Sequence, residues 1–118
     1  MATLGDLERT VMDVLWDADG ALTSTEVLDA VAAARGSVPA TTTVLTVLSR
    51  LEKKAFVTRD RRRRPHRYRA VRTREEHTAE VMHEVLGSAP DREAVLARFV
   101  GGVDAREAEA LRRMLDAR

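Results

Sequence analysis

The sequence contains no cysteine, which excludes disulfide bonds, thiolate nucleophiles and zinc sites built on thiolates. A chain without cysteine also fits a reducing compartment. Aromatic residues are scarce, so aliphatic side chains must supply most of any core; the only aromatic residues are Trp16, Phe56, Tyr68 and Phe99.

Long apolar runs are missing as well. No run approaches the ~20 residues that a membrane-spanning helix needs. Residues 1–20 carry acidic side chains throughout and lack the apolar centre of a signal peptide. We therefore expect a soluble, cytoplasmic protein with no membrane insertion. Its 118 residues suffice for one domain, or for a small domain with an appendage.

No catalytic or metal centre can be assembled from the sequence. The carboxylates are scattered, and there is neither a glycine-rich phosphate loop nor a set of nucleophile, base and orienting acid. One segment carries metal-binding residue types at His77, Glu80, His83 and Glu84. It lacks the HExxH motif, and His83 lies off the face that the other three share. We interpret this segment as a solvated, partly salt-bridged helix face, and we expect no metal, no cofactor and no enzyme activity.

The most informative stretch begins with an amphipathic helix over residues 41–54. Its apolar residues recur at i, i+3, i+4 and i+7: Val44, Val47, Leu48 and Leu51. At about 100° per residue the opposite side carries short hydroxyls and cations but no carboxylate. Short hydroxyls let a helix approach another surface closely, and they can bond to phosphate oxygens or base edges.

A basic hairpin follows this helix. Runs with strand-type alternation at 56–59 and 66–71 flank the cationic segment 61–65, which predicts a β-hairpin with a basic tip. From Arg50 to Arg74 there are 12 Lys or Arg residues and two acids, a local net charge of +10, whereas the whole chain is +1. Such a concentration of like charge calls for an anionic partner.

A polar-faced helix leading into a basic hairpin is what a winged helix-turn-helix presents to double-stranded DNA. A solvated helix followed by a charged loop is the plainer interpretation. Two further alternatives are an RNA-binding or architectural module without operator specificity, and a small interaction protein whose hairpin docks an acidic partner.

The residues expected to contact DNA come from the helix and the hairpin. Arg50 is the best candidate for guanine. Lys53 and the arginines at 61–64 are expected to hold phosphates or to enter the minor groove, and His66 to touch a phosphate. The full set is Thr41, Thr42, Thr43, Thr46, Ser49, Arg50, Lys53, Arg61, Arg62, Arg63, Arg64, His66 and Arg67.

The N-terminal part supplies the remaining elements of this fold. A helix is expected over residues 4–18, and the pair 21–22 could add a third strand to the hairpin. Thr23 and Glu26 form a capping box for a helix that ends near Ala34, with Gly36 suited to its C-terminal cap. Overall we predict a mainly α fold with a minor β component (α+β minor): a winged helix-turn-helix over residues 1–72 and a helical dimerisation region over residues 73–118.

The C-terminal region differs from the rest of the chain in charge and in its helical pattern. Residues 75–118 carry a net charge of −4 and read as three short amphipathic helices with caps at Thr73, Asp91 and Asp104. Helices this short cannot bury their apolar faces on themselves. A second copy in a C2 homodimer is the expected partner, and packing back on the DNA-binding part is the alternative. The expected dimerisation residues are Met82, Val85, Leu86, Leu96, Phe99, Leu111, Met114 and Leu115.

Three separated motifs resemble the penicillinase repressor (BlaI/MecI/CopY) family. Residues 8–16, ERTVMDVLW, are similar to the E-x-x-[VI]-M-x-x-[LI]-W run of that family's first helix. Residues 42–54 resemble its T-T-V-x-T-x-L-x-R-L-x-x-K recognition helix, and residues 66–68 its second wing strand. The resemblance covers residues 4–72 well, and beyond them it rests on length and helical pattern.

The resemblance implies a homodimeric repressor that sits on inverted repeats upstream of β-lactamase or copper-export genes. In the antibiotic-responsive branch a membrane sensor protease system leads to cleavage of the repressor at an Asn-Phe bond. This chain has Arg98-Phe99 at that position, which makes Arg98 and Phe99 the candidate cleavage site. The copper branch uses Cys-x-Cys pairs, which a chain without cysteine cannot form.

Overall fold

The computed structural model describes residues 4–118 and divides the chain into two compact units, with the division between Val81 and Met82. Residues 1–3, with which the predicted DNA-binding domain begins, lie outside the described part. None of the helices in residues 4–118 is both long and apolar enough to cross a membrane. The predicted domain boundary at residue 72 falls earlier than this division and stays a prediction.

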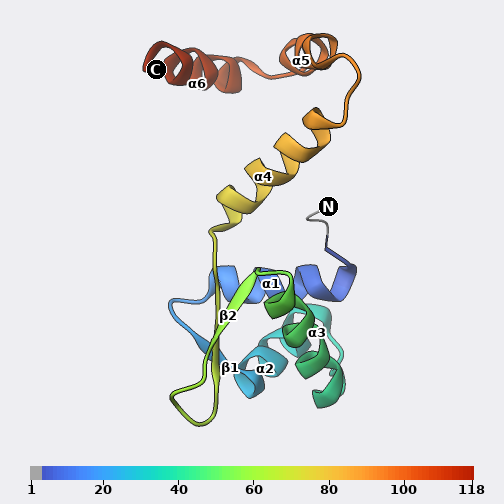
Figure 1. Cartoon of the computed structure of the whole chain (residues 1–118), viewed down its shortest axis with the longest axis vertical. Helices are drawn as coiled ribbons and strands as arrows, with labels where there is room; N and C mark the ends of the chain where they lie inside the picture. The colour runs from blue at the N-terminus through green and yellow to red at the C-terminus, as the bar shows by residue number, and fades with distance from the viewer. Residues whose placement is uncertain (1–3) are drawn as a thin grey trace. The chain divides into compact units, whose positions relative to one another are not determined.

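The first unit contains three helices, a small sheet and the first half of a fourth helix (Figure 1). In chain order its elements are α1 (Asp6–Asp17), β1 (Leu22–Thr23), α2 (Ser24–Arg35), α3 (Thr41–Lys53), β2 (Val57–Asp60), β3 (Arg67–Ala70) and α4 (Arg74–Gly87). This is the predicted order of helix, short strand, helix, recognition helix and hairpin, so the predicted winged helix-turn-helix fold is confirmed.

Local signals in the sequence set the helix ends. The Thr23 hydroxyl accepts a hydrogen bond from the Glu26 backbone N–H at 3.2 Å, and Thr23 N–H donates to the Glu26 carboxylate at 2.9 Å. Gly36 ends α2 in the left-handed region at φ 73°, where a side chain would be strained. The first helix begins at Asp6, two residues later than predicted, because Gly5 is its N-cap.

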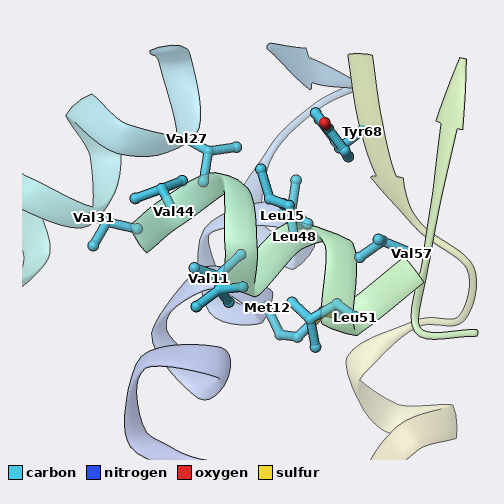
Figure 2. Packing of buried hydrophobic residues seen from close by; sticks show 11 residues of the cluster. Val11, Met12, Leu15, Val27, Val31, Val44, Leu48, Leu51, Val57 and Tyr68 are labelled. Atoms are coloured by element: carbon cyan, nitrogen blue, oxygen red, sulfur yellow. The ribbon is translucent and has the colours of Figure 1, made fainter. Parts of the chain in front are cut away.

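The apolar face of α3 forms the centre of the core (Figure 2). Val44, Leu48 and Leu51 point toward side chains from α1 and α2, and Val57 and Tyr68 close the core from the hairpin. All four apolar residues predicted for this helix are buried. Burying this face leaves the opposite face of α3 turned to solvent.

The three strands form an antiparallel sheet in the order β1-β3-β2. Asp60 pairs with Arg67 in the last strand pair before the hairpin tip, and Leu22 of β1 pairs with Tyr68. Between α3 and β2 the chain turns through Ala55 at φ 65°, and Phe56 N–H donates to the Leu51 carbonyl at 2.9 Å. This Schellman-type turn fixes where the hairpin leaves the recognition helix.

The interpretation of His77 as part of a solvated face was wrong. Its side chain is only 5% exposed and lies between two aromatic rings, with centroids 5.3 Å from Trp16 and 5.3 Å from Phe56. The physical reason is that α1 and the α3–β2 turn provide an aromatic surface, which the local pattern of α4 does not reveal. Glu80 does pair with Arg72, as expected of a partly salt-bridged face.

The second unit, residues 82–118, comprises the end of α4 together with α5 (Arg92–Gly101) and α6 (Ala105–Asp116). Asp91 caps α5 by accepting from Ala94 N–H at 3.1 Å, and Asp104 caps α6 by accepting from Glu107 N–H at 2.8 Å. Both caps were predicted. Although the structure describes α5 and α6 in full, neither helix buries a single residue.

Candidate nucleic-acid interface

The polar face of α3 is exposed along its whole length. It consists of hydroxyls and cations, with Leu45 beside them at 39% exposure. Every α3 residue predicted to contact DNA lies on this surface: Thr41, Thr42, Thr43, Thr46, Ser49, Arg50 and Lys53. Because the other face is fixed in the core, the helix can present this surface without moving.

Two details define the N-terminal half of this face. The Thr46 hydroxyl donates to the Thr42 carbonyl oxygen at 2.8 Å, which fixes its direction. Ala40 occupies the N-cap and has no side chain that could accept from the first N–H groups of α3. The start of the helix therefore keeps backbone donors and the positive end of its dipole for an outside anion.

The hairpin tip carries the densest charge. The side chains of Arg61 to Arg64 are exposed, whereas His66 and Arg67 are half-buried at the base of the tip. Burial, together with the nearby guanidinium groups of Arg64, Arg59 and Arg61, holds the pKa of His66 below its usual value. The hydrogen bond from the Arg62 side chain holds the pKa of Asp60 below its usual range.

Several cations of this surface are paired with carboxylates. The Lys54 ammonium lies 2.9 Å from a Glu8 oxygen, and the Glu52 carboxylate lies 3.5 Å from Arg59 and 3.2 Å from Arg61. The sequence did not predict these ion pairs. A pair such as Glu8 and Lys54 joins α1 to the end of α3 across 46 positions, so no local pattern signals it.

The surface around these residues is hollowed in two places. One hollow of about 410 Å³ separates the start of α1 from the polar face of α3, and is lined by Gly5, Leu7, Glu8, Thr42, Thr43, Thr46, Val47 and Arg50. A second of about 430 Å³ lies against the hairpin and is lined mostly by arginines. The second hollow is strongly cationic, whereas the first combines hydroxyls and Arg50 with the Glu8 carboxylate.

The predicted dimerisation residues are exposed or half-buried. Phe99 is 51% exposed and Leu115 is 64% exposed, although both are apolar. Within the second unit, α5 and α6 line an apolar groove of about 660 Å³, to which Leu96, Phe99, Leu111 and Leu115 contribute. Met82, Val85 and Met114 are exposed by more than half, and Leu86 is half-buried.

The candidate cleavage pair lies inside a helix. Arg98 and Phe99 belong to α5, which continues to Gly101, and both side chains are exposed. Proteases bind their substrates as extended strands, so the peptide bond between these residues would be accessible only after the helix has opened locally.

Comparison with known proteins identifies the relatives of this chain. The model of the family described as "Penicillinase repressor" matches residues 4–117. The protein named "Transcriptional regulator BlaI" of Mycobacterium tuberculosis is 47% identical over 118 residues, which cover 98% of this chain and 84% of the relative.

Solved structures with lower identity share the fold. RosR of H. salinarum superposes with a TM-score of 0.55 at 18% identity, covering 97% of this chain and 94% of that one. BpsR of Bordetella bronchiseptica, whose DNA binding is regulated by 6-hydroxynicotinic acid, superposes with a TM-score of 0.51 at 21% identity. The match covers 97% of this chain and 74% of that one. At these identities the likeness supports the fold alone.

The family match spans both units, and the identity to the mycobacterial regulator extends over almost the whole chain. The motifs at residues 8–16, 42–54 and 66–68 lie on α1, on α3 with its C-cap and at the start of β3. The chain therefore belongs to the penicillinase repressor family.

Proposed function

We propose that this protein is a homodimeric repressor that binds an inverted-repeat operator in double-stranded DNA. Its family consists of transcriptional regulators rather than enzymes. The observation that carries the proposal is the exposed polar face of α3, which offers hydroxyls and cations while its apolar face is buried in the core. As a regulator of bacterial DNA, the protein would act in the cytoplasm.

In this proposal α3 lies in the major groove. Arg50 can offer two guanidinium donors to the O6 and N7 acceptors of guanine, and the threonine hydroxyls can meet base edges or phosphates. The hairpin arginines would hold the backbone or enter the adjacent minor groove. His66 and Arg67, at the base of the tip, would meet phosphates.

The homodimer follows from apolar surface that the second unit leaves uncovered. Phe99, Leu96 and Leu115 line one apolar groove and are each about half exposed or more. Burial is worth about 25 cal/mol per Å² of apolar surface. A second copy would cover such a groove, and it would also bring a second recognition helix to the other half of a palindromic site.

The test of DNA binding starts from the DNA upstream of the protein's own gene. A duplex carrying an inverted repeat from that region and a scrambled duplex should be compared by fluorescence anisotropy at two salt concentrations. We expect the operator to bind at least ~10³-fold tighter than the scrambled duplex. Equal affinity for both would contradict operator recognition and favour a non-specific nucleic-acid-binding module.

The test of the homodimer is analytical ultracentrifugation of the full chain. The wild type should sediment as a dimer, and Phe99→Glu should shift it toward monomer because a charge would be buried in the apolar interface. Val38→Glu is a matched control, since Val38 is 76% exposed in the first unit. A Phe99→Glu protein that is as dimeric as the control would exclude this interface.

For the relief of repression we propose proteolysis between Arg98 and Phe99, signalled by a membrane sensor protease system. The cut would separate α6 and Phe99 from the rest of the chain and so remove much of the apolar groove. Operator affinity would fall, because two linked half-sites bind far better than one. Arginine differs from asparagine in charge and size, so the protease would need an altered preference.

Ligand-driven and concentration-driven release are the alternatives to proteolysis. Cells that carry the tagged repressor should be exposed to a β-lactam and to other cell-wall stresses, and the repressor followed by immunoblot. A fragment ending at Arg98 is the expected product. Derepression with the repressor still full-length would rule proteolysis out, and one of the alternatives would then apply.

A further inference from the structure

The basic surface contains cations of two kinds. Arg50, Lys53, Arg63 and Arg64 have no carboxylate within ion-pair distance among the described residues. Lys54, Arg59 and Arg61, by contrast, are held by Glu8 of α1 or Glu52 of α3. In the conformation seen here, each cation of the second kind already has a carboxylate partner.

Glu8 is fixed in its position. Its side chain is 12% exposed, the Gly5 backbone N–H donates to it at 3.0 Å, and Lys54 Nζ reaches both of its oxygens at 3.2 and 2.9 Å. The Gly5 N–H and the Lys54 ammonium hold the pKa of Glu8 below its usual value and so stabilise its charged form. It also borders the hollow beside Arg50.

Glu52 holds two cations at once. It lies in the last turn of α3 with its side chain 23% exposed, and its two oxygens face different arginines. Arg59 comes from β2 and also stacks on the Tyr68 ring, with its guanidinium carbon 6.0 Å from the ring centroid. Arg61 begins the hairpin tip. A single carboxylate thus connects the recognition helix to the wing.

We propose that Glu8 and Glu52 are internal competitors of DNA phosphate, which lower the part of the DNA affinity that does not depend on sequence. The inference rests on the proposed DNA binding and deepens it. It assigns a role to two of the acidic residues that lie among the cations of this surface.

An encounter with DNA leaves Lys54 two possible partners, Glu8 or a phosphate. If Lys54 stays on Glu8, it displaces no counterion from the duplex and adds nothing to the salt-dependent affinity. If it moves to a phosphate, it leaves the Glu8 carboxylate unpaired beside a polyanion, and like-charge repulsion offsets the gain. The same choice applies to Glu52 with Arg59 and Arg61. Each carboxylate therefore reduces the contribution of its cations.

The experiment measures affinity for a scrambled duplex between about 50 and 200 mM salt with the full-length chain. In Glu8→Gln one cation is released, so the slope of log K against log salt should steepen by about 0.9. In Glu52→Gln two are released, and the slope should steepen by up to about 1.8. Affinity at the lowest salt should rise several-fold. Thermal melting checks that each variant is folded.

Two controls distinguish the effect of breaking an ion pair from the effect of removing one negative charge. Glu75→Gln removes the same charge from an exposed residue of α4 that has no ion-pair partner within the described part of the chain, and it should behave as the wild type. Lys54→Gln should leave the wild-type slope unchanged, and the Glu8→Gln/Lys54→Gln double variant should restore it. Slopes for Glu8→Gln and Glu52→Gln that equal the Glu75→Gln slope would overturn the proposal.

A failure of the proposed function would give a different result from a failure of this inference. A wild-type protein that prefers no sequence would contradict operator recognition, while the slopes on scrambled DNA would still report on Glu8 and Glu52. If Glu8→Gln does not fold, Glu52→Gln decides alone, because its pairs involve different elements.

Discussion

The indole N–H of Trp16 donates to the backbone carbonyl of Arg72 at 3.0 Å, which ties α1 to the segment that leads from the wing into α4. The Arg74 guanidinium lies 5.3 Å from the centroid of the same ring and pairs with Asp17 at 2.9 Å. His77 then covers the ring from the first turns of α4. The start of α4 therefore packs as part of the first unit.

We expect His77→Ala to destabilise the first unit by about 1–3 kcal/mol, because it leaves a void between Trp16 and Phe56. The matched control is His83→Ala, the same change on an exposed position of the same helix, which should stay within about 0.5 kcal/mol. Urea denaturation of both variants measures the difference. Equal stabilities would show that the ring contacts of His77 contribute nothing.

Two truncated chains test where the DNA-binding unit ends. A chain that stops at Val81 keeps His77 and should unfold cooperatively as a monomer with weak operator binding, since it loses the second half-site. A chain that stops at Arg74 exposes Trp16 and Phe56 and should melt at a lower temperature. Thermal melting and sedimentation check both. A Val81 chain that still dimerises would contradict dimerisation through the second unit.

Mutations in the recognition helix and in the hairpin should have different effects on DNA binding. We expect Arg50→Ala to lose about 1–3 kcal/mol of discrimination between operator and scrambled DNA. Replacing Arg63 and Arg64, which have no carboxylate partner among residues 4–118, should weaken all duplexes alike and flatten the salt slope by about 0.9 for each phosphate that is no longer neutralised. Competition binding measures both. A change of sequence preference in the hairpin variant alone would invert these roles.

DNA affinity should increase as the pH falls through the titration range of His66. The pKa of His66 is lowered in the free protein by burial and neighbouring arginines. Phosphates near the ring would favour the charged form and raise that pKa, so binding takes up a proton and is favoured at lower pH. In His66→Gln the affinity should not vary over this range. A pH dependence that survives in the variant would assign the proton to another group.

Features encoded within a few residues could be predicted from the sequence. The period of Val44, Val47 and Leu48 specifies the buried face of α3, and the Thr23–Glu26 and Asp104–Glu107 pairs mark helix starts, because capping acts over three positions. The contacts of His77 could not be predicted in this way. They depend on rings from α1 and the α3–β2 turn, which only the tertiary fold brings together.

The same limit applies to the charges of the candidate interface. The sequence shows how many cations the stretch from Arg50 to Arg74 carries, but not which of them are already paired. Glu8 precedes Lys54 by 46 positions, so their pairing follows from the packing of α1 against α3. Arg67 likewise meets Glu26 only because β1 joins the hairpin.

The hydrogen bond between Thr46 and Thr42 has a consequence for the bases that this helix can distinguish. With its proton committed to a carbonyl, the Thr46 hydroxyl has only lone pairs to offer. In the major groove, the hydrogens that would meet a lone pair belong to the exocyclic amino groups of adenine and cytosine. We therefore expect Thr46→Val to relax the preference for these two bases at a single operator position. Selection from a randomised operator library would reveal it, and an unchanged selected sequence would contradict it.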